Sequence, residues 1–242
     1  HINFGDKNET LNLANDINRV GANLAKEYPD KLGYLATLPL PYITESVAIF
    51  NDAIANNALG VTVPTNSRGI YFGSPIMDEL YKVMNDKSVI VALHPNEPSA
   101  SPKNVDIDLP TPLLGFFMDT TMTFVNLLKY RFFERFPNIK LIVPHAGAFL
   151  GILDDRIADY VKLKYNTDIY KVMKHVYFDT AGRVLPRQLP MLLTLADENN
   201  ILYGSDIPYT PLAGSATLGQ ALESTDVLTS SQKNKIFHDN AY

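Results

Sequence analysis

Short apolar runs recur along the chain, and turn-forming residues bound each of them. The runs contain few polar residues before their last positions, which is typical of strands that are buried on both faces of a sheet. They predict six strands, over residues 34–40, 60–65, 89–94, 141–145, 176–180 and 201–206.

Helical patterns lie between these runs and predict helices over residues 11–28, 43–57, 77–86, 116–136 and 189–200. Strands that alternate with helices of this length form a parallel sheet covered by helices, so the expected fold class is α/β. No linker rich in Pro, Gly or Ser divides the chain, and we expect one domain over residues 1–242. Residues 95–112 carry five prolines and no periodicity, which predicts a long loop directly after His94. Such a loop is either functional or a plain surface excursion.

Composition narrows the possible partners. The net charge of −5 argues against a nucleic-acid partner, because such proteins normally carry a basic face. No stretch approaches the ~18–20 apolar residues of a membrane span, and HINFGDKNET lacks the pattern of a signal peptide. The chain has no cysteine, so a metal site must use His, Asp or Glu. We therefore expect a cytoplasmic protein with no membrane and no nucleic-acid partner.

Three predicted strands end in residues that can do chemistry, namely His94, His145 and Asp206. The carboxyl ends of parallel strands open onto one shared face, so these side chains are expected to converge. Together they suit a divalent metal and acid/base catalysis. Each also has a structural reading: His94 can cap a turn, His145 can be a hydrogen-bonded core residue, and Asp206 can begin a helix or turn. Three such residues at equivalent positions favour a single site.

Other polar residues carry less information about function. Asp179 ends a fourth strand, where it either supports the site or hydrogen-bonds neighbouring backbone. His175 precedes its strand and is expected on the opposite face, His238 lies in a charged C-terminal helix, and His1 is terminal. The motifs GxGxxG, GxxxxGK[ST], GxSxG and HExxH are absent, which argues against the common nucleotide-binding, serine-hydrolase and zincin classes.

A family resemblance runs in order along nearly the whole chain. The stretches that carry it are ATLPLP (36–41), GVTVPTNSRGIYFG (60–73), VIVALHP (89–95), ERFPNIKLIVPHAGAF (134–149), VYFDTAG (176–182) and ILYGSDIPYTP (201–211). Together they resemble the amidohydrolase-related metal-dependent family that includes aminocarboxymuconate semialdehyde decarboxylase, γ-resorcylate decarboxylase and 6-methylsalicylate decarboxylase. The resemblance implies a distorted (β/α)8 TIM-like barrel.

The resemblance also implies roles for the residues at the strand ends. His94 and Asp206 would bind one divalent metal, zinc in the first instance and manganese as the alternative. His145 would be an acid/base group beside the metal, and Asp206 could share in proton transfer. No organic cofactor is implied.

Two further residues match positions of the family that contact substrate. Arg156 resembles an arginine that reaches the site of a neighbouring subunit to hold the substrate carboxylate, and its alternative is a surface ion pair with Asp154 or Asp155. Tyr209 matches an aromatic position that lines the pocket, although it can also serve packing alone. A homodimer is expected from the family.

The sequence departs from the family pattern at its start. The family has a first strand with an HxH or ExH pair, which supplies the remaining metal ligands, and then a second strand; neither precedes HINFGD. We expect the first one or two strands of the barrel, roughly 60–80 residues, to be missing from this chain. Two protein ligands would then remain where a tight site has three or more.

The expected activity is therefore that of a metal-dependent non-oxidative decarboxylase, a carboxy-lyase that acts on a small aromatic or unsaturated carboxylic acid. One alternative is hydrolysis of an amide, lactone or ester by metal-activated water, and another is an inactive fragment or scaffold. Hydrolases of this superfamily commonly hold two metals through a carboxylated lysine. No lysine ends a predicted strand, which favours the decarboxylase.

Overall fold

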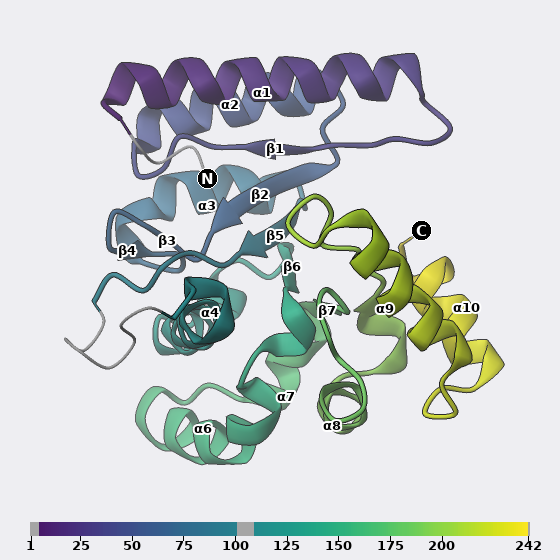
Figure 1. Cartoon of the computed structure of the whole chain (residues 1–242). Helices are drawn as coiled ribbons and strands as arrows, with labels where there is room; N and C mark the ends of the chain where they lie inside the picture. The colour runs from purple at the N-terminus through teal and green to yellow at the C-terminus, as the bar shows by residue number, and fades with distance from the viewer. Residues whose placement is uncertain (1–4, 101–108, 242) are drawn as a thin grey trace.

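A six-stranded parallel sheet organises the molecule (Figure 1). The computed structural model describes residues 5–100 and 109–241. The strands lie in the order β1 (Leu35–Thr37), β2 (Gly60–Pro64), β5 (Ile90–His94), β6 (Lys140–Val143), β7 (Val176–Asp179) and β8 (Ile201–Leu202). Each of the six predicted strands is confirmed, and all neighbouring pairs are parallel. A short antiparallel hairpin, β3 (Asn66–Ser67) and β4 (Ile70–Tyr71), follows β2 and was not predicted.

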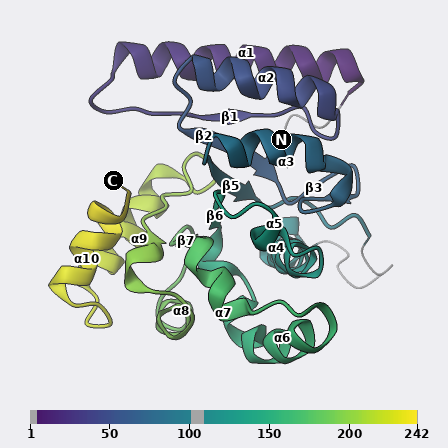
Figure 2. The ribbon, with the colours of Figure 1, turned by 180° about the vertical axis from the view of Figure 1, so that it is seen from behind.

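Helices connect the strands. The α-helices are α1 (Lys7–Glu27), α2 (Ile43–Ala55), α3 (Asp78–Asp86), α4 (Thr111–Lys129), α5 (Phe132–Arg135), α6 (Leu150–Tyr165), α7 (Ile169–Val172), α8 (Gln188–Leu195), α9 (Leu212–Ser224) and α10 (Ser230–Phe237). Short 3₁₀ turns are η1 (Pro75–Met77), η2 (His145–Gly147), η3 (Met173–His175), η4 (Glu198–Asn200) and η5 (Asp239–Ala241). In both views α1 and α2 lie beside β1, while α9 and α10 lie at the other end of the sheet (Figure 2).

The helix predicted over residues 116–136 is in fact two helices. Helix α4 ends at Lys129, and Arg131 adopts a left-handed conformation with φ of 52° before α5 begins. This conformation cannot continue a right-handed helix. Helix α4 begins at Thr111, inside the loop predicted over 95–112, and residues 101–108 of that loop lie outside the described residues.

Helices α6 and α9 were not predicted from the pattern. In α6 only Leu150 and Val161 are buried. Its apolar face is therefore too narrow to give a clear helical pattern of apolar residues in the sequence. In α9 the sequence LAGSATLGQALES is rich in small residues, and Ser215 and Leu222 are its buried positions.

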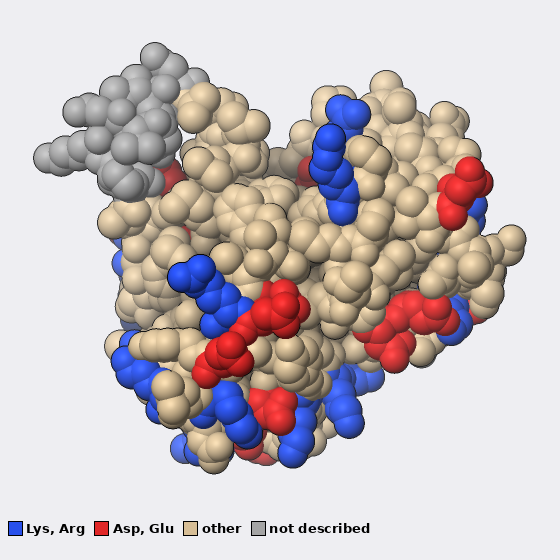
Figure 3. Space-filling view, turned by 90° about the horizontal axis from the view of Figure 1, so that it is seen from below, with Lys and Arg blue, Asp and Glu red and all other residues tan. Residues whose placement is uncertain are grey.

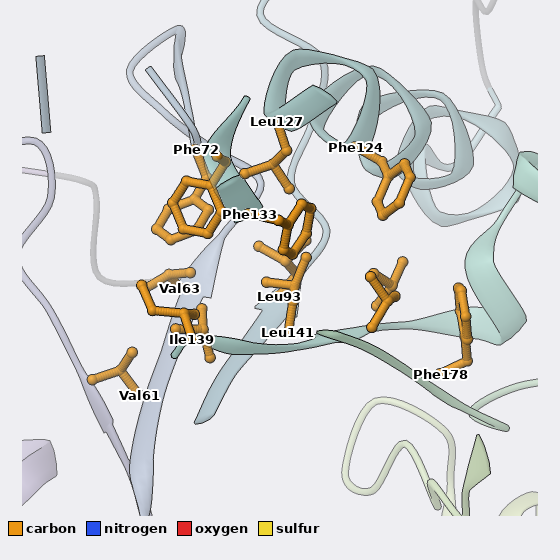
Figure 4. Packing of buried hydrophobic residues seen from close by; sticks show 14 of the residues in the cluster. Val61, Val63, Phe72, Leu93, Phe124, Leu127, Phe133, Ile139, Leu141 and Phe178 are labelled. Atoms are coloured by element: carbon orange, nitrogen blue, oxygen red, sulfur yellow. The ribbon is translucent and has the colours of Figure 1, made fainter. Parts of the chain in front are cut away.

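The core lies between the sheet and the helices that cover it. Figure 4 shows Phe124 and Leu127 of α4 pointing towards Leu93 and Leu141 of the sheet, and all four side chains are buried. Close strand pairing also requires a glycine. A Cβ atom on Gly60 would lie 2.2 Å from the carbonyl oxygen of Ile90, so no larger residue fits between β2 and β5 without a shift of backbone.

The two edge strands of this sheet are β1 and β8, and the described residues show no pairing between them. Helix α1 covers part of the β1 edge. The Asn18 side chain donates to the carbonyl oxygen of Thr37 at 3.0 Å and accepts from its backbone N–H at 2.8 Å. The amide thus takes the place of a neighbouring strand at this residue.

Acidic and basic side chains are intermixed over the lower part of the face shown in Figure 3, which is hollowed at its upper edge. Within the described ranges, no helix has the length and apolar character needed to cross a bilayer.

Candidate active site

A cavity of about 580 Å³ opens where the strands end. Its walls include His94, which ends β5, His145, which follows β6, and Asp206, which follows β8. The three residues singled out from the sequence therefore meet at one site. The parallel sheet explains this meeting, because all its strands end at the same rim.

The imidazole of His94 is fixed by the residue that follows it. Its Nδ1 donates to the carbonyl oxygen of Pro95 at 2.9 Å, and this tautomer makes Nε2 the atom able to coordinate a metal. Burial lowers the pKa of His94 below its ordinary value, and His145 adds to this effect, while the bond to Pro95 and the charge of Asp206 oppose it. The neutral imidazole is the form that binds metals.

The backbone around His145 is strained. His145, Ala146, Gly147 and Ala148 all have positive φ, at 56°, 51°, 80° and 54°. Non-glycine residues rarely adopt this region, and such strain concentrates at functional sites. The turn is held by Gln188, whose Nε2 donates to the carbonyl oxygen of His145 at 2.7 Å.

The His145 ring has one unsatisfied atom. Its Nδ1 is buried and has no hydrogen-bond partner among the described residues. A buried polar atom without a partner costs about 1–3 kcal/mol, so a bound group at this position would relieve the cost. The ring also stacks on Phe117, with centroids 5.7 Å apart and planes 22° from parallel.

Asp179 contacts the backbone of the site. Its Oδ1 accepts from the N–H groups of His145 at 2.8 Å and Ala181 at 3.0 Å. Burial raises the pKa of Asp179 and the charge of Asp206 adds to this rise, while the electrostatic interaction with His145 and the two N–H donors act against it. Both readings of Asp179 from the sequence thus apply, since it bonds neighbouring backbone and by doing so supports the His145 turn.

Asp206 is held by the residues after it. It has positive φ of 57°, and Thr210 binds it twice, with Oγ1 on Oδ2 at 2.6 Å and the backbone N–H on the carbonyl oxygen at 2.7 Å. These bonds turn the chain back towards the cavity. Tyr209, between them, is 69% exposed, and its ring centroid lies 5.4 Å from that of His94.

Sequence reasoning missed several cavity residues. Phe116 and Phe117 line the cavity from α4, and Arg183 and Gln188 line it from the segment after β7. The phenylalanines belong to a Phe-rich helical pattern that is equally consistent with core or interface. Arg183 follows the strand-end stretch VYFDTAG, so its place in the sequence was a usable signal.

Arg156 lies away from the cavity of its own chain. It is exposed on α6, and no ion pair of its side chain is found within the described residues, so the predicted alternative with Asp154 or Asp155 is not seen. Its predicted role in a neighbouring subunit stays a prediction.

The other histidines lie elsewhere. His175 precedes β7 at the opposite end of the sheet, with its ring stacked 6.0 Å from Phe133. His238 follows the end of α10 instead of lying within it, and bonds Asp239 at 2.8 Å. His1 lies outside the described residues.

The side chains in the cavity are of types that bind divalent metals. An imidazole and a carboxylate face one cavity beside a buried ring nitrogen without a partner. Over the ranges that the structure describes, no three His, Cys, Asp or Glu side chains gather to hold an ion. A metal held by His94 and Asp206 would therefore need at least one further donor.

Comparisons with known proteins place the chain in a family. The family model described as amidohydrolase matches residues 3–242. The decarboxylase macB of Penicillium terrestre is 28% identical over 226 residues, which cover 84% of this chain and 65% of that protein. The 6-methylsalicylic acid decarboxylase of Penicillium expansum is 26% identical over 216 residues, covering 85% of this chain and 66% of that protein. The match thus spans less than two thirds of the length of these relatives.

Solved structures share the fold. A crystal structure of an amidohydrolase II is 63% identical, with a TM-score of 0.98, and the match covers 100% of this chain and 79% of that one. A dihydroxybenzoic acid decarboxylase from Polaromonas, with bound manganese and 2-nitroresorcinol, is 19% identical with a TM-score of 0.84, covering 98% of this chain and 76% of that one. The latter likeness concerns the fold alone. From the family match over nearly its whole length, the chain belongs to the amidohydrolase family.

Proposed function

We propose that this chain carries the catalytic rim of a metal-dependent, non-oxidative decarboxylase that acts on a small aromatic carboxylic acid. The observation that carries the proposal is the meeting of His94, His145 and Asp206 in one cavity with aromatic walls. The decarboxylases among the family relatives support the reaction type.

In this proposal His94, through Nε2, and Asp206 hold a divalent metal, together with donors from outside the described residues. Zinc and manganese both suit imidazole and carboxylate ligands, and the related fold with bound manganese supports the second. When bound there, such a metal would supply the positive charge that polarises a substrate oxygen next to the carboxylate.

In this proposal His145 is the proton donor. The bond between the ring carbon and the carboxylate breaks, CO₂ leaves, and the electron pair stays on the carbon. His145, as imidazolium, then donates a proton to that carbon and becomes neutral. The hydrogen bonds from Gln188 to the His145 carbonyl and from the His145 N–H to Asp179 fix the backbone that carries this ring.

The cavity walls support an aromatic acid as the substrate. Phe116, Phe117 and Tyr209 offer flat apolar surfaces around the two imidazoles. Arg183 brings a positive charge to the same cavity, which suits a carboxylate. No lysine is among the described residues that line the cavity, so the carboxylated lysine of two-metal hydrolases has no counterpart there.

We also propose that the active form is a homodimer in which Arg156 of one copy reaches the site of the other. Leu114, Met118 and Met122 form an exposed apolar row on α4, and Ile152 on the adjoining α6 is 67% exposed. Arg156 lies one turn after Ile152 on the same helix. A second copy that packs on this surface would bury the apolar row and bring Arg156 of each copy close to the other copy.

The experiment follows CO₂ release from a panel of salicylate-type acids by the full-length protein loaded with zinc or manganese, beside a panel of esters, lactones and amides. His145→Gln is expected to lower the rate about 10²–10⁴-fold, the usual contribution of an acid/base group. His175→Gln, at the opposite end of the sheet, is the control and should retain activity. Turnover of the second panel alone would contradict the proposal and favour a hydrolase.

A further inference from the structure

A buried carboxylate lies behind the candidate metal ligand. Asp119 of α4 is 0% exposed. Its Oδ2 accepts from the Thr65 hydroxyl and from Asn66 Nδ2 at 2.9 Å, and its Oδ1 accepts from the Tyr71 hydroxyl at 2.7 Å. No ion pair to it is found in the part of the chain that the structure describes. Burial of a carboxylate costs desolvation free energy, and the three hydrogen bonds offset that cost for Asp119.

Asp119 is connected to His94 by the Thr65 hydroxyl and the Pro95–Asn96 peptide unit. The Thr65 hydroxyl has a single proton, which it gives to Asp119, so its oxygen is left to accept, and it accepts from the Asn96 N–H at 2.8 Å. That N–H belongs to the same peptide unit as the Pro95 carbonyl, which accepts from His94 Nδ1 at 2.9 Å. The described cis peptide bonds lie elsewhere, so this unit is trans and its N–H and C=O point in opposite directions.

Further bonds brace the same unit. The Asn96 side chain donates to the Asn66 carbonyl at 3.0 Å, and Asn66 Nδ2 donates to the Glu97 carbonyl at 2.9 Å. The Thr65 N–H donates to the His94 carbonyl at 2.9 Å. The end of β2, the hairpin after it and the segment after His94 are therefore fastened to a single carboxylate on α4.

We propose that Asp119 is a positioning residue for His94: by accepting the Thr65 proton it fixes the Pro95–Asn96 peptide, whose carbonyl holds His94 Nδ1–H and so presents Nε2 to the cavity. The predicted effect of Asp119 on metal affinity rests on the proposed function, whereas its predicted effect on the tautomer of His94 does not. Asp119 is not among the residues that line the cavity.

Two substitutions interrupt this chain of hydrogen bonds from Asp119 to His94 at different points. Asp119→Leu removes both acceptor oxygens at nearly the same side-chain size, so the Thr65 hydroxyl loses the partner that fixes its direction. Thr65→Val removes the hydroxyl, and Thr65→Ser restores it. The matched control is Thr120→Val on the same helix, because Thr120 is equally buried and its hydroxyl has no described partner.

The first readout is the tautomer of His94 in the metal-free protein, measured by ¹⁵N NMR of labelled histidines and assigned with His94→Gln. The wild type, Thr65→Ser and Thr120→Val should show a protonated Nδ1 and an unprotonated Nε2. Asp119→Leu and Thr65→Val should show a mixture of tautomers. If Asp119→Leu does not fold, Thr65→Val decides. An unchanged His94 tautomer in the folded variants overturns the proposal.

The second readout is the affinity for Zn²⁺ or Mn²⁺ alone, by calorimetry. Asp119→Leu and Thr65→Val should bind about 10–100-fold more weakly than the wild type, as is usual when the partner of a ligating histidine is disturbed. Wild-type affinity in both variants would reduce Asp119 to a stabilising role and overturn the proposal. A wild type that binds no metal would contradict the proposed function, while the tautomer measurement would still decide whether Asp119 positions His94.

Discussion

The backbone N–H of His145 donates a 2.8 Å hydrogen bond to Oδ1 of Asp179, the last residue of the neighbouring strand β7. This bond joins two strand ends and holds the left-handed turn that carries the His145 ring into the cavity. The same carboxylate is buried, and its pKa is raised. Asp179 therefore links the geometry of the site to the stability of the fold.

We predict that Asp179 makes stability fall as the pH rises. A folded-state pKa above the ordinary value of about 3.9 means that the folded protein binds more protons than the unfolded chain from about pH 4 upwards. Asp179→Asn keeps an acceptor oxygen and cannot titrate. The free energy of unfolding of the wild type, relative to this variant, should decline from about pH 4 until the folded pKa is passed. Urea unfolding at a series of pH values measures it, with the exposed Asp30→Asn as the control for loss of one charge. A relative stability that rises over this range would be inconsistent with burial as the dominant effect.

We predict that Arg183 contributes to substrate binding. Arg183→Gln should raise KM for a carboxylate substrate about fivefold with a smaller change in kcat, because an ion pair at an exposed arginine contributes up to about 1 kcal/mol. Arg187→Gln is the control, since Arg187 is exposed on the same segment but does not line the cavity. Equal effects of the two substitutions on steady-state kinetics would argue against a role specific to Arg183.

We predict that Gly147→Ala destabilises the protein by about 1–3 kcal/mol. Gly147 has φ of 80°, and a Cβ there would lie 3.0 Å from Cε1 of the buried Phe178. Gly214→Ala in α9 is the control. Its nearest neighbour would be Thr210 Cγ2 at 3.4 Å, and alanine favours a helix by about 1 kcal/mol. Chemical unfolding should therefore move in opposite directions for the two variants, and equal shifts would contradict the strained-turn account.

Local patterns predicted the strands well because a buried parallel strand is apolar along its whole length. The ends of the predicted strands indicated that His94, His145 and Asp206 share one rim, and all three line the same cavity. The reason is general, since the direction of parallel strands fixes which ends meet.

Long-range and strained features were beyond such patterns. The hydrogen bonds of Asp119 reach Thr65, 54 positions away, and Tyr71, 48 positions away, and nothing in the sequence near Asp119 indicates either partner. The left-handed Arg131 that separates α4 from α5 is likewise set by tertiary packing, because Phe132 and Phe133 on its far side are buried.

The central claim is that His94 and Asp206 are metal ligands, and metal content tests it most directly. Elemental analysis of the full-length protein should find about one zinc or manganese per chain in the wild type and in His175→Ala, and a loss of that metal in His94→Ala. A wild type without metal, or a His94→Ala variant that keeps it, would contradict the account.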